Sequence, residues 1–259
     1  MKALLPALAG IVFTAAAAGG QLAPVKAGVY RWAGLAAANA GGGRVERVVL
    51  TGSTLDLDAL EVRAITVPPS ASPDTAAGHD SLECFVLVKE GRLMASLGGV
   101  TRALGAGGAA LVLPGDRLVL TNVGGAPATY YRFTYRSRAP MDMERGRRAG
   151  GSFMLDYTEL TEKPTAVGFR RDVVNRPTAM FRRFESHWSS VKEGVRNHAT
   201  HTHRADEFMM VTKGNLRMLI GTEEPPATLG DVVFLGSMLP HSLLSKGAGP
   251  SQYLVIQGE

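Results

Sequence analysis

Cysteine is almost absent from this sequence, with Cys84 the single one in 259 residues. One cysteine excludes an intrachain disulfide, so no disulfide framework can hold the fold. We expect Cys84 to be a small buried hydrophobic residue rather than a nucleophile. The sequence also lacks Gly-x-x-x-x-Gly-Lys-Ser/Thr, a strand-linked Gly-x-Gly-x-x-Gly and the Gly-x-Ser-x-Gly turn. These absences argue against a P-loop nucleotide site, a dinucleotide site and an α/β-hydrolase nucleophile.

Charge of either sign is modest, with 28 Lys and Arg against 23 Asp and Glu. Basic residues are scattered except in 132–148 and 169–183. No basic run is interleaved with aromatic residues, as it is in proteins that bind single-stranded nucleic acid. We therefore predict no nucleic-acid partner. The excess of positive charge favours a solvated basic face, and attraction of an anionic substrate or a membrane surface is the alternative.

The N-terminus has the pattern of an export signal. Lys2 supplies a positive charge, 3–18 are apolar, and Ala16-Ala17-Ala18 offers a small-x-small cleavage site. The stretch is shorter than the roughly 20 apolar residues of a membrane span and is interrupted by proline and glycine. We predict a cleaved signal peptide over 1–20 rather than an uncleaved anchor. A periplasmic or secreted protein without a stable membrane span would follow.

The chain repeats itself at a constant spacing. Phe208 lies 123 positions after Phe85, and Tyr253 lies 123 positions after Tyr130. Several glycines and a proline between these positions keep the same offset without a gap. Such a register is typical of two copies of one fold unit. Each copy consists of short aliphatic or β-branched runs separated by Gly, Pro, Asn and Asp, which predicts an all-β sandwich or barrel.

The repeat divides the chain into five parts. Composition and periodicity predict an N-terminal arm over 21–50 after the signal segment, a first β unit over 51–137, and a second β unit over 179–259. Residues 138–178 are more charged and less periodic. We interpret them as an irregular linker with a short helix around 140–148.

A group of histidines stands in the second copy. Three of the six histidines lie within 198–203. On a strand, His201 and His203 would point to the same face roughly 6.6 Å apart, so both imidazoles could converge on one ion. Glu207 keeps the same parity, and His241 offers a ligand from a neighbouring strand. The alternative is that these histidines are structural or surface residues.

The segments around these residues resemble the two cupin motifs. HTHRADEFMMVTKG is similar to the first motif, and GDVVFLGSMLPH is similar to the second, although Gly236-Ser237-Met238 replaces its usual Pro-x-Gly. The resemblance implies an all-β bicupin of two tandem cupin barrels, which are double-stranded β-helix or jelly-roll units. It also implies one divalent metal ion: Mn or Fe by preference, Ni or Zn otherwise. The residues that would hold it are His201, His203, Glu207 and His241.

The first copy lacks an equivalent ligand set. Shifting the four ligands back by 123 positions gives Gly78, Asp80, Cys84 and Leu118. Gly78 and Leu118 cannot ligate through their side chains. The nearby Glu83 is displaced by one position, which on a strand turns its side chain to the other face. We therefore predict a metal-free, degenerate first barrel.

Residues for substrate binding are predicted from parity and position, and no catalytic residue is assigned. Met209, Met218 and Phe234 are expected to line the pocket, with core packing as the alternative. Arginines could hold an anion by bidentate contacts. The candidates are Arg182, Arg183, Arg196 and Arg204, with Arg204 the best placed and a surface role as its alternative. Groups that could orient the imidazoles are Asp206, Glu185 and Thr202.

Over residues 55–259 the architecture also resembles the (S)-ureidoglycine aminohydrolases, which are manganese bicupins. Those enzymes are expected to use Glu-x-His-x-x-x-His plus Gln, so the ligand set here is more similar to germins, oxalate-degrading cupins and cupin dioxygenases. The leading interpretation is an exported metal-dependent enzyme that acts on a small polar or anionic molecule by hydrolysis, oxidation, decarboxylation or isomerisation. The alternatives are a non-catalytic cupin that binds a sugar or phenolic, a ureidoglycine aminohydrolase-like hydrolase, and a barrel whose metal is only structural. The resemblance also allows a homodimer.

Overall fold

A computed structural model describes residues 21–69 and 71–259, so the predicted signal peptide lies outside the described residues. Nearly all regular structure in the described residues is β-strand, which confirms the all-β prediction. The short helix α1 (Met143–Arg148) lies within the predicted 140–148, and its N-cap Asp142 accepts a hydrogen bond from the Arg145 backbone N–H. None of the helices in the described part of the chain is long and apolar enough to span a membrane.

The first unit packs a seven-stranded sheet against a four-stranded sheet, and all pairings are antiparallel. The larger sheet has the order β12 (Phe153–Leu155), β9 (Ala109–Val112), β6 (Glu83–Glu90), β11 (Ala128–Ser137), β4 (Leu57–Val67), β3 (Val45–Gly52) and β2 (Ala38–Asn39). The smaller sheet has the order β5 (Asp74–Ala77), β10 (Leu118–Asn122), β7 (Arg92–Leu97) and β8 (Val100–Gly105).

The second unit repeats this plan with its own strands. Its larger sheet has the order β1 (Gly28–Tyr30), β19 (Val232–Leu235), β16 (Asp206–Lys213), β21 (Ser251–Gly258), β15 (Phe184–Val191), β14 (Gly168–Arg176) and β13 (Lys163–Pro164). The smaller sheet has the order β18 (Pro226–Thr228), β17 (Asn215–Ile220) and β20 (His241–Lys246). Two single-turn 3₁₀ helices, η1 (Trp32–Gly34) and η2 (Tyr157–Glu159), follow β1 and β12.

The turns after β6 and β16 show why the repeat keeps its glycines. Gly91 has φ 82° and Gly214 has φ 74°, a region that other residues rarely adopt. A Cβ on Gly91 would lie 2.6 Å from the Cβ of Ala128, and a Cβ on Gly214 would lie 2.6 Å from the Oγ of Ser251. Both turns therefore need glycine for conformation and for space.

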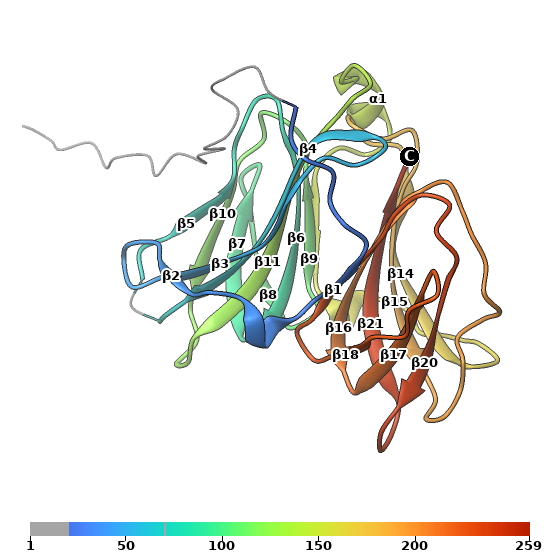
Figure 1. The fold of residues 1–259 in the computed structure, drawn as a ribbon. Coiled ribbons are helices and arrows are strands. Elements are labelled where there is room, and N and C mark those ends of the chain that lie inside the picture. The colour runs from blue at the N-terminus through green and yellow to red at the C-terminus, as the bar shows by residue number, and fades with distance from the viewer. Residues whose placement is uncertain (1–20, 70) are drawn as a thin grey trace, which may run out of the picture.

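Each unit lends one strand to the sheet of the other. β1 comes from the predicted arm yet pairs with β19 of the second unit, and β12 comes from the predicted linker yet pairs with β9 of the first. In Figure 1 the blue chain near the N-terminus crosses from the first unit to the second. These strands cover edges that would otherwise leave backbone groups unpaired.

Regular strands also lie inside the predicted arm and the predicted linker. β3 begins at Val45 inside the predicted arm, and β14 spans Gly168–Arg176 inside the predicted linker. The sequence does not predict β14 because its charged residues, such as Arg170 and Asp172, conceal the alternation of a strand. Here these side chains pair with one another across a half-buried face, with Arg170 Nε 2.5 Å from Asp172 Oδ1.

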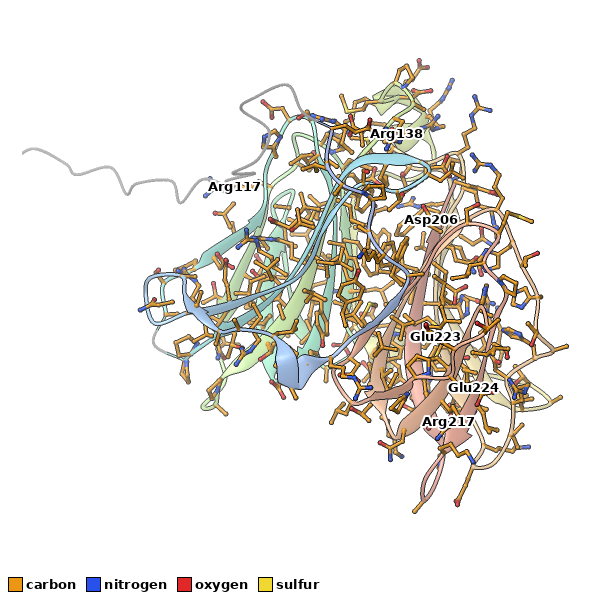
Figure 2. All side chains as sticks on the ribbon, in the orientation of Figure 1. Arg117, Arg138, Asp206, Arg217, Glu223 and Glu224 are labelled. Carbon is orange, nitrogen blue, oxygen red and sulfur yellow. The ribbon has the colours of Figure 1, made fainter. Side chains whose placement is uncertain are left out.

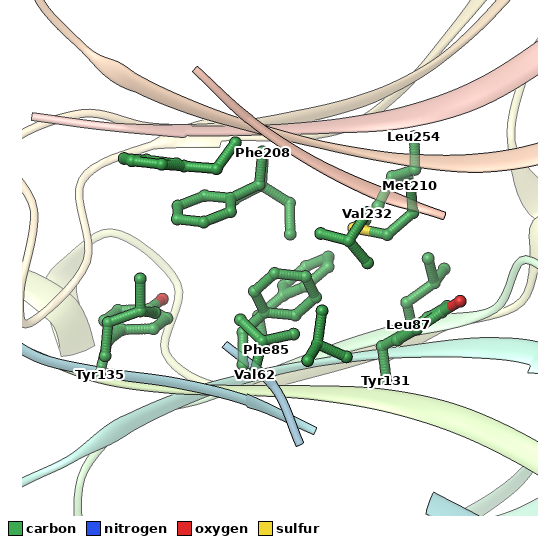
Figure 3. Close-up of a cluster of buried hydrophobic side chains, with 14 of the residues drawn as sticks. Val62, Phe85, Leu87, Tyr131, Tyr135, Phe208, Met210, Val232 and Leu254 are labelled. Carbon is green, nitrogen blue, oxygen red and sulfur yellow. The ribbon is translucent and has the colours of Figure 1, made fainter. Parts of the chain in front are cut away.

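The large sheets of the two units face each other across a shared core, shown in Figure 3. Phe85 and Tyr131 from the first unit lie opposite Phe208 and Leu254 from the second. Burying each such side chain contributes about 1.5–3 kcal/mol, so the shared core joins the units firmly. Two other cores fill the barrels, and charged residues such as Arg117 lie outside (Figure 2).

Two buried acids at equivalent positions also tie the units together. The Glu83 carboxylate accepts a hydrogen bond from the Tyr135 hydroxyl at 2.8 Å and another from the backbone N–H of Ala179, in the second unit, at 3.0 Å. Asp206, labelled in Figure 2, lies 123 positions later and is close enough to Thr54 and Leu55 of the first unit for both to affect its pKa. The repeat therefore extends to the contacts between its two copies.

Candidate metal centre

Three of the four predicted ligands come together at one end of the second barrel. His201 lies in the loop before β16, and His241 is the first residue of β20. The two are joined by backbone hydrogen bonds, from His201 N to His241 O at 3.2 Å and from His241 N to His201 O at 3.0 Å. His203 completes the group, and the candidate ligand atoms of the three histidines all lie within 4.8 Å of one another.

The spacing of the three rings fits binding to one ion. The ring centroids are 5.4 Å apart for His201 and His203, 4.6 Å for His201 and His241, and 4.8 Å for His203 and His241. Imidazoles bound through Nε2 at about 2.1 Å, with angles of roughly 90–109° at the metal, would have centroids about 4.5–5.2 Å apart. Only a small movement separates the observed arrangement from that geometry.

Hydrogen bonds prepare two of these rings as ligands. The Nδ1 of His203 lies 2.8 Å from the carbonyl oxygen of Ala205, and the Nδ1 of His241 lies 2.8 Å from that of Leu239. A carbonyl only accepts, so Nδ1 carries a hydrogen in both rings and Nε2 is the nitrogen left to bind a metal. The Nε2 of His241 is buried and has no partner among the described residues, as expected of an atom that ligates a metal. Backbone carbonyls thus do the orienting for which Asp206, Glu185 and Thr202 were candidates.

Glu207 lies beside the histidines at the start of β16. Its Oε2 is 3.2 Å from the Nε2 of His203 and accepts a 2.5 Å hydrogen bond from the Nε2 of Gln257. Two ligand atoms at right angles on one metal ion are about 3 Å apart, so Glu207 and His203 fit neighbouring coordination positions. Gln257, on β21 opposite Glu207, was missed by the sequence analysis because its proximity follows from strand register.

The pKa values of most of these groups suit metal binding. Burial lowers the pKa of His241, and burial together with the neighbouring His198 and His203 lowers that of His201. The hydrogen bond to Glu207 raises the pKa of His203, so a metal ion would have to displace the proton that these two residues share. Burial alone would raise the pKa of Glu207, but hydrogen bonds from His203 and Gln257 outweigh it and the pKa is lowered. Neutral imidazoles beside an ionised carboxylate are the forms that bind a divalent cation.

Side chains of the second barrel line a cavity of about 610 Å³ that contains His201, His203 and Glu207. Inward-facing positions of two neighbouring strands form much of its wall, with Glu185, His187 and Ser189 on β15 and Tyr253, Val255 and Gln257 on β21. The carboxylate of Glu185 lies 2.6 Å from the Nη2 of Arg170 and 3.2 Å from the Nδ1 of His187, and it also accepts a hydrogen bond from Arg183.

The predicted substrate residues lie in different surroundings. Arg204 lines the cavity, but its guanidinium makes two hydrogen bonds with Asp56, at 2.8 and 2.9 Å. Met209 and Met218 are buried in the core that fills the barrel and are not among the cavity residues. Arg183 lines the cavity close to His203, which places a guanidinium beside the cluster.

Phe234 lies on the wrong face for the cavity. It pairs with Phe208, whereas Glu207 pairs with Leu235. Paired residues of neighbouring strands share a face, so Phe234 points away from the site and stacks on Phe208 in the shared core, with ring centroids 4.8 Å apart.

By sequence, the chain matches no known protein family and no curated protein. Its fold is similar to that of the protein Ylba from E. coli, with a TM-score of 0.71 and 17% identity over 89% of this chain and 90% of that one. The fold is also similar to that of a putative glyoxylate-induced protein from Pseudomonas aeruginosa, with a TM-score of 0.68 and 15% identity over 86% of this chain and 84% of that one. For oxalate decarboxylase from Lactobacillus farciminis, in complex with formate, the TM-score is 0.71 and the identity 9%, over 91% of this chain and 87% of that one. Likeness at these identities establishes the fold alone, and at that level the prediction of two cupin barrels in tandem is confirmed.

Proposed function

We propose that the protein is a metal-dependent enzyme that acts on a small organic acid in the second barrel. The supporting observation is the convergence of three imidazoles and an ionised carboxylate, of which His201, His203 and Glu207 line a large cavity. Three nitrogens and one oxygen suit Mn, Fe, Ni or Zn, and Mn or Fe is preferred. Such an ion, when bound, polarises a carboxylate or carbonyl group and lowers the pKa of bound water.

Arg183 is proposed to bind the carboxylate of the acid. Its Nη2 donates to Glu185, and its Nη1 is 3.9 Å from Glu259, so the half-exposed guanidinium keeps donors for a ligand. A planar guanidinium can hold a carboxylate through two hydrogen bonds. Gln257 orients the Glu207 carboxylate through its 2.5 Å hydrogen bond. The similar structures of an oxalate decarboxylase and a glyoxylate-induced protein favour small acids as the first compounds to test.

Because the N-terminus has the pattern of a signal peptide, we also propose that the protein is exported. The protein should therefore be produced with its own signal segment and without a nickel column, since added nickel could occupy the site. Metal content by ICP mass spectrometry is expected to give about one Mn or Fe per chain, and His241→Ala should lose it. Cys84→Ser is the control that should keep it. Turnover of oxalate and glyoxylate is then measured with and without O₂. Wild-type protein without stoichiometric metal would refute the proposal.

A further inference from the structure

The cavity is much larger than a two-carbon acid requires. Its volume is about 610 Å³. At about 30 Å³ per molecule, that space would hold roughly 20 waters, whereas a two-carbon acid would replace only about three. Cavities of this size typically bury ligands of a dozen or more heavy atoms. A ligand that fills the cavity must extend well beyond the metal cluster.

The wall away from the histidines carries both donors and acceptors. On β15 the inward side chains are Glu185, His187 and Ser189, and on the next strand Arg170 lies beside them. Glu185 is only 8% exposed and is already held by arginines, so the group offers hydrogen bonds with little net negative charge. Ser189 and His187 are partly exposed in the cavity, and Ser189 lies opposite Tyr253 on the neighbouring strand.

This wall favours a ligand with hydroxyl groups over one with an alkyl chain. An alkyl chain would cover the polar groups of His187 and Ser189 without making hydrogen bonds to them. Leaving buried polar groups without hydrogen bonds costs free energy of binding. A hydroxyl both donates and accepts, so it can match either kind of partner. Val167, Val191 and Val255 supply apolar patches for the C–H faces of a carbon chain or ring.

We infer that the ligand is a polyhydroxylated acid of about six carbons, a sugar acid in chemical class. Its carboxylate and the adjacent hydroxyl would face the metal cluster and Arg183, and its other hydroxyls would contact His187, Ser189 and their neighbours. This inference rests on the proposed function for the placement of the acid group. The assignment of the distal wall rests on the cavity itself.

Three acids with the same 2-hydroxycarboxylate head test this inference. Glycolate has the head alone, 2-hydroxyhexanoate adds an alkyl chain, and gluconate adds a chain of hydroxyls. Isothermal titration calorimetry on the Mn²⁺-loaded protein should show gluconate binding at least tenfold more tightly than either of the others. An equal or higher affinity for 2-hydroxyhexanoate or for glycolate would overturn it.

Variants on one strand supply the matched control. Ser189→Ala should weaken gluconate binding severalfold and leave glycolate binding unchanged. Ser186→Ala removes a hydroxyl that is buried on the opposite face of β15, outside the cavity, so it should change neither. Metal-dependent glycolate binding without a gluconate preference would refute this inference and leave the proposed function standing. Failure of all three acids to bind the metal-loaded protein would refute both.

Discussion

Replacing Glu83 by glutamine tests the buried contact between the two units. Burial raises the pKa of this carboxyl from 4.5 to about 7, although hydrogen bonds from Thr178, Tyr135 and the 179–180 backbone oppose the shift. An acid whose pKa is raised on folding stabilises the protein fully below its unfolded pKa, and that stability is lost as the pH rises through the folded value. At 1.36 kcal/mol for each pKa unit, the whole effect is about 3 kcal/mol, of which about 2.5 kcal/mol falls between pH 5 and pH 8.

Guanidinium unfolding at pH 5, 6, 7 and 8 measures this effect, with tryptophan fluorescence as the probe because Trp188 lies in the shared core. The free energy of unfolding of the wild type relative to Glu83→Gln should fall by about 2.5 kcal/mol from pH 5 to pH 8. Glu144→Gln, on the exposed surface of α1, should follow the wild type at every pH. Parallel curves for the wild type and Glu83→Gln would refute a titrating Glu83 at the interface.

Three further predictions follow from single residues. Adding Mn²⁺ at 100 times its dissociation constant should raise the unfolding free energy of the wild type by about 2.7 kcal/mol and leave His241→Ala unchanged, as chemical denaturation would show. Met238 has φ 60°, a region that glycine adopts without strain. Met238→Gly should therefore keep metal binding and raise the free energy of unfolding by up to about 1 kcal/mol, measured by the same chemical denaturation. Burial raises the pKa of the Cys84 thiol to about 12, so a thiol reagent such as DTNB should modify it only after unfolding; rapid modification of the native protein would contradict its burial.

The sequence predicted the duplication and the histidine cluster because both depend on local spacing. The constant 123-residue offset requires no knowledge of strand order, and His201 and His203 are close to each other along the chain. His241 could be added because the second motif ends on it. These residues do lie together, although His201 and His203 precede β16 instead of lying on a strand as expected.

The remaining features depend on register between strands distant in sequence, which spacing alone does not reveal. Gln257 meets Glu207 only because β21 pairs with β16, and Phe234 turns away because it pairs with Phe208. The exchange of β1 and β12 could not be predicted either, since these strands of three residues carry no periodic pattern. Polar residues on β14 belong to the cavity face of a sheet, where charged groups satisfy one another, and so do not mark a linker.

The pairing of the two barrels places residues of the first barrel close to the candidate metal site of the second. Asp206 lies close to Thr54 and Leu55 of the first unit, and the next residue in the chain is Glu207. Asp206 also accepts a 2.9 Å hydrogen bond from the backbone of Ser237, in the loop that leads to His241. Because this carboxylate lies against the first unit and is bonded to the segment that leads to His241, the position of the first unit bears on the geometry of the site. This contact gives a reason for the chain to keep a first barrel whose positions equivalent to the ligands have become Gly78, Asp80, Cys84 and Leu118.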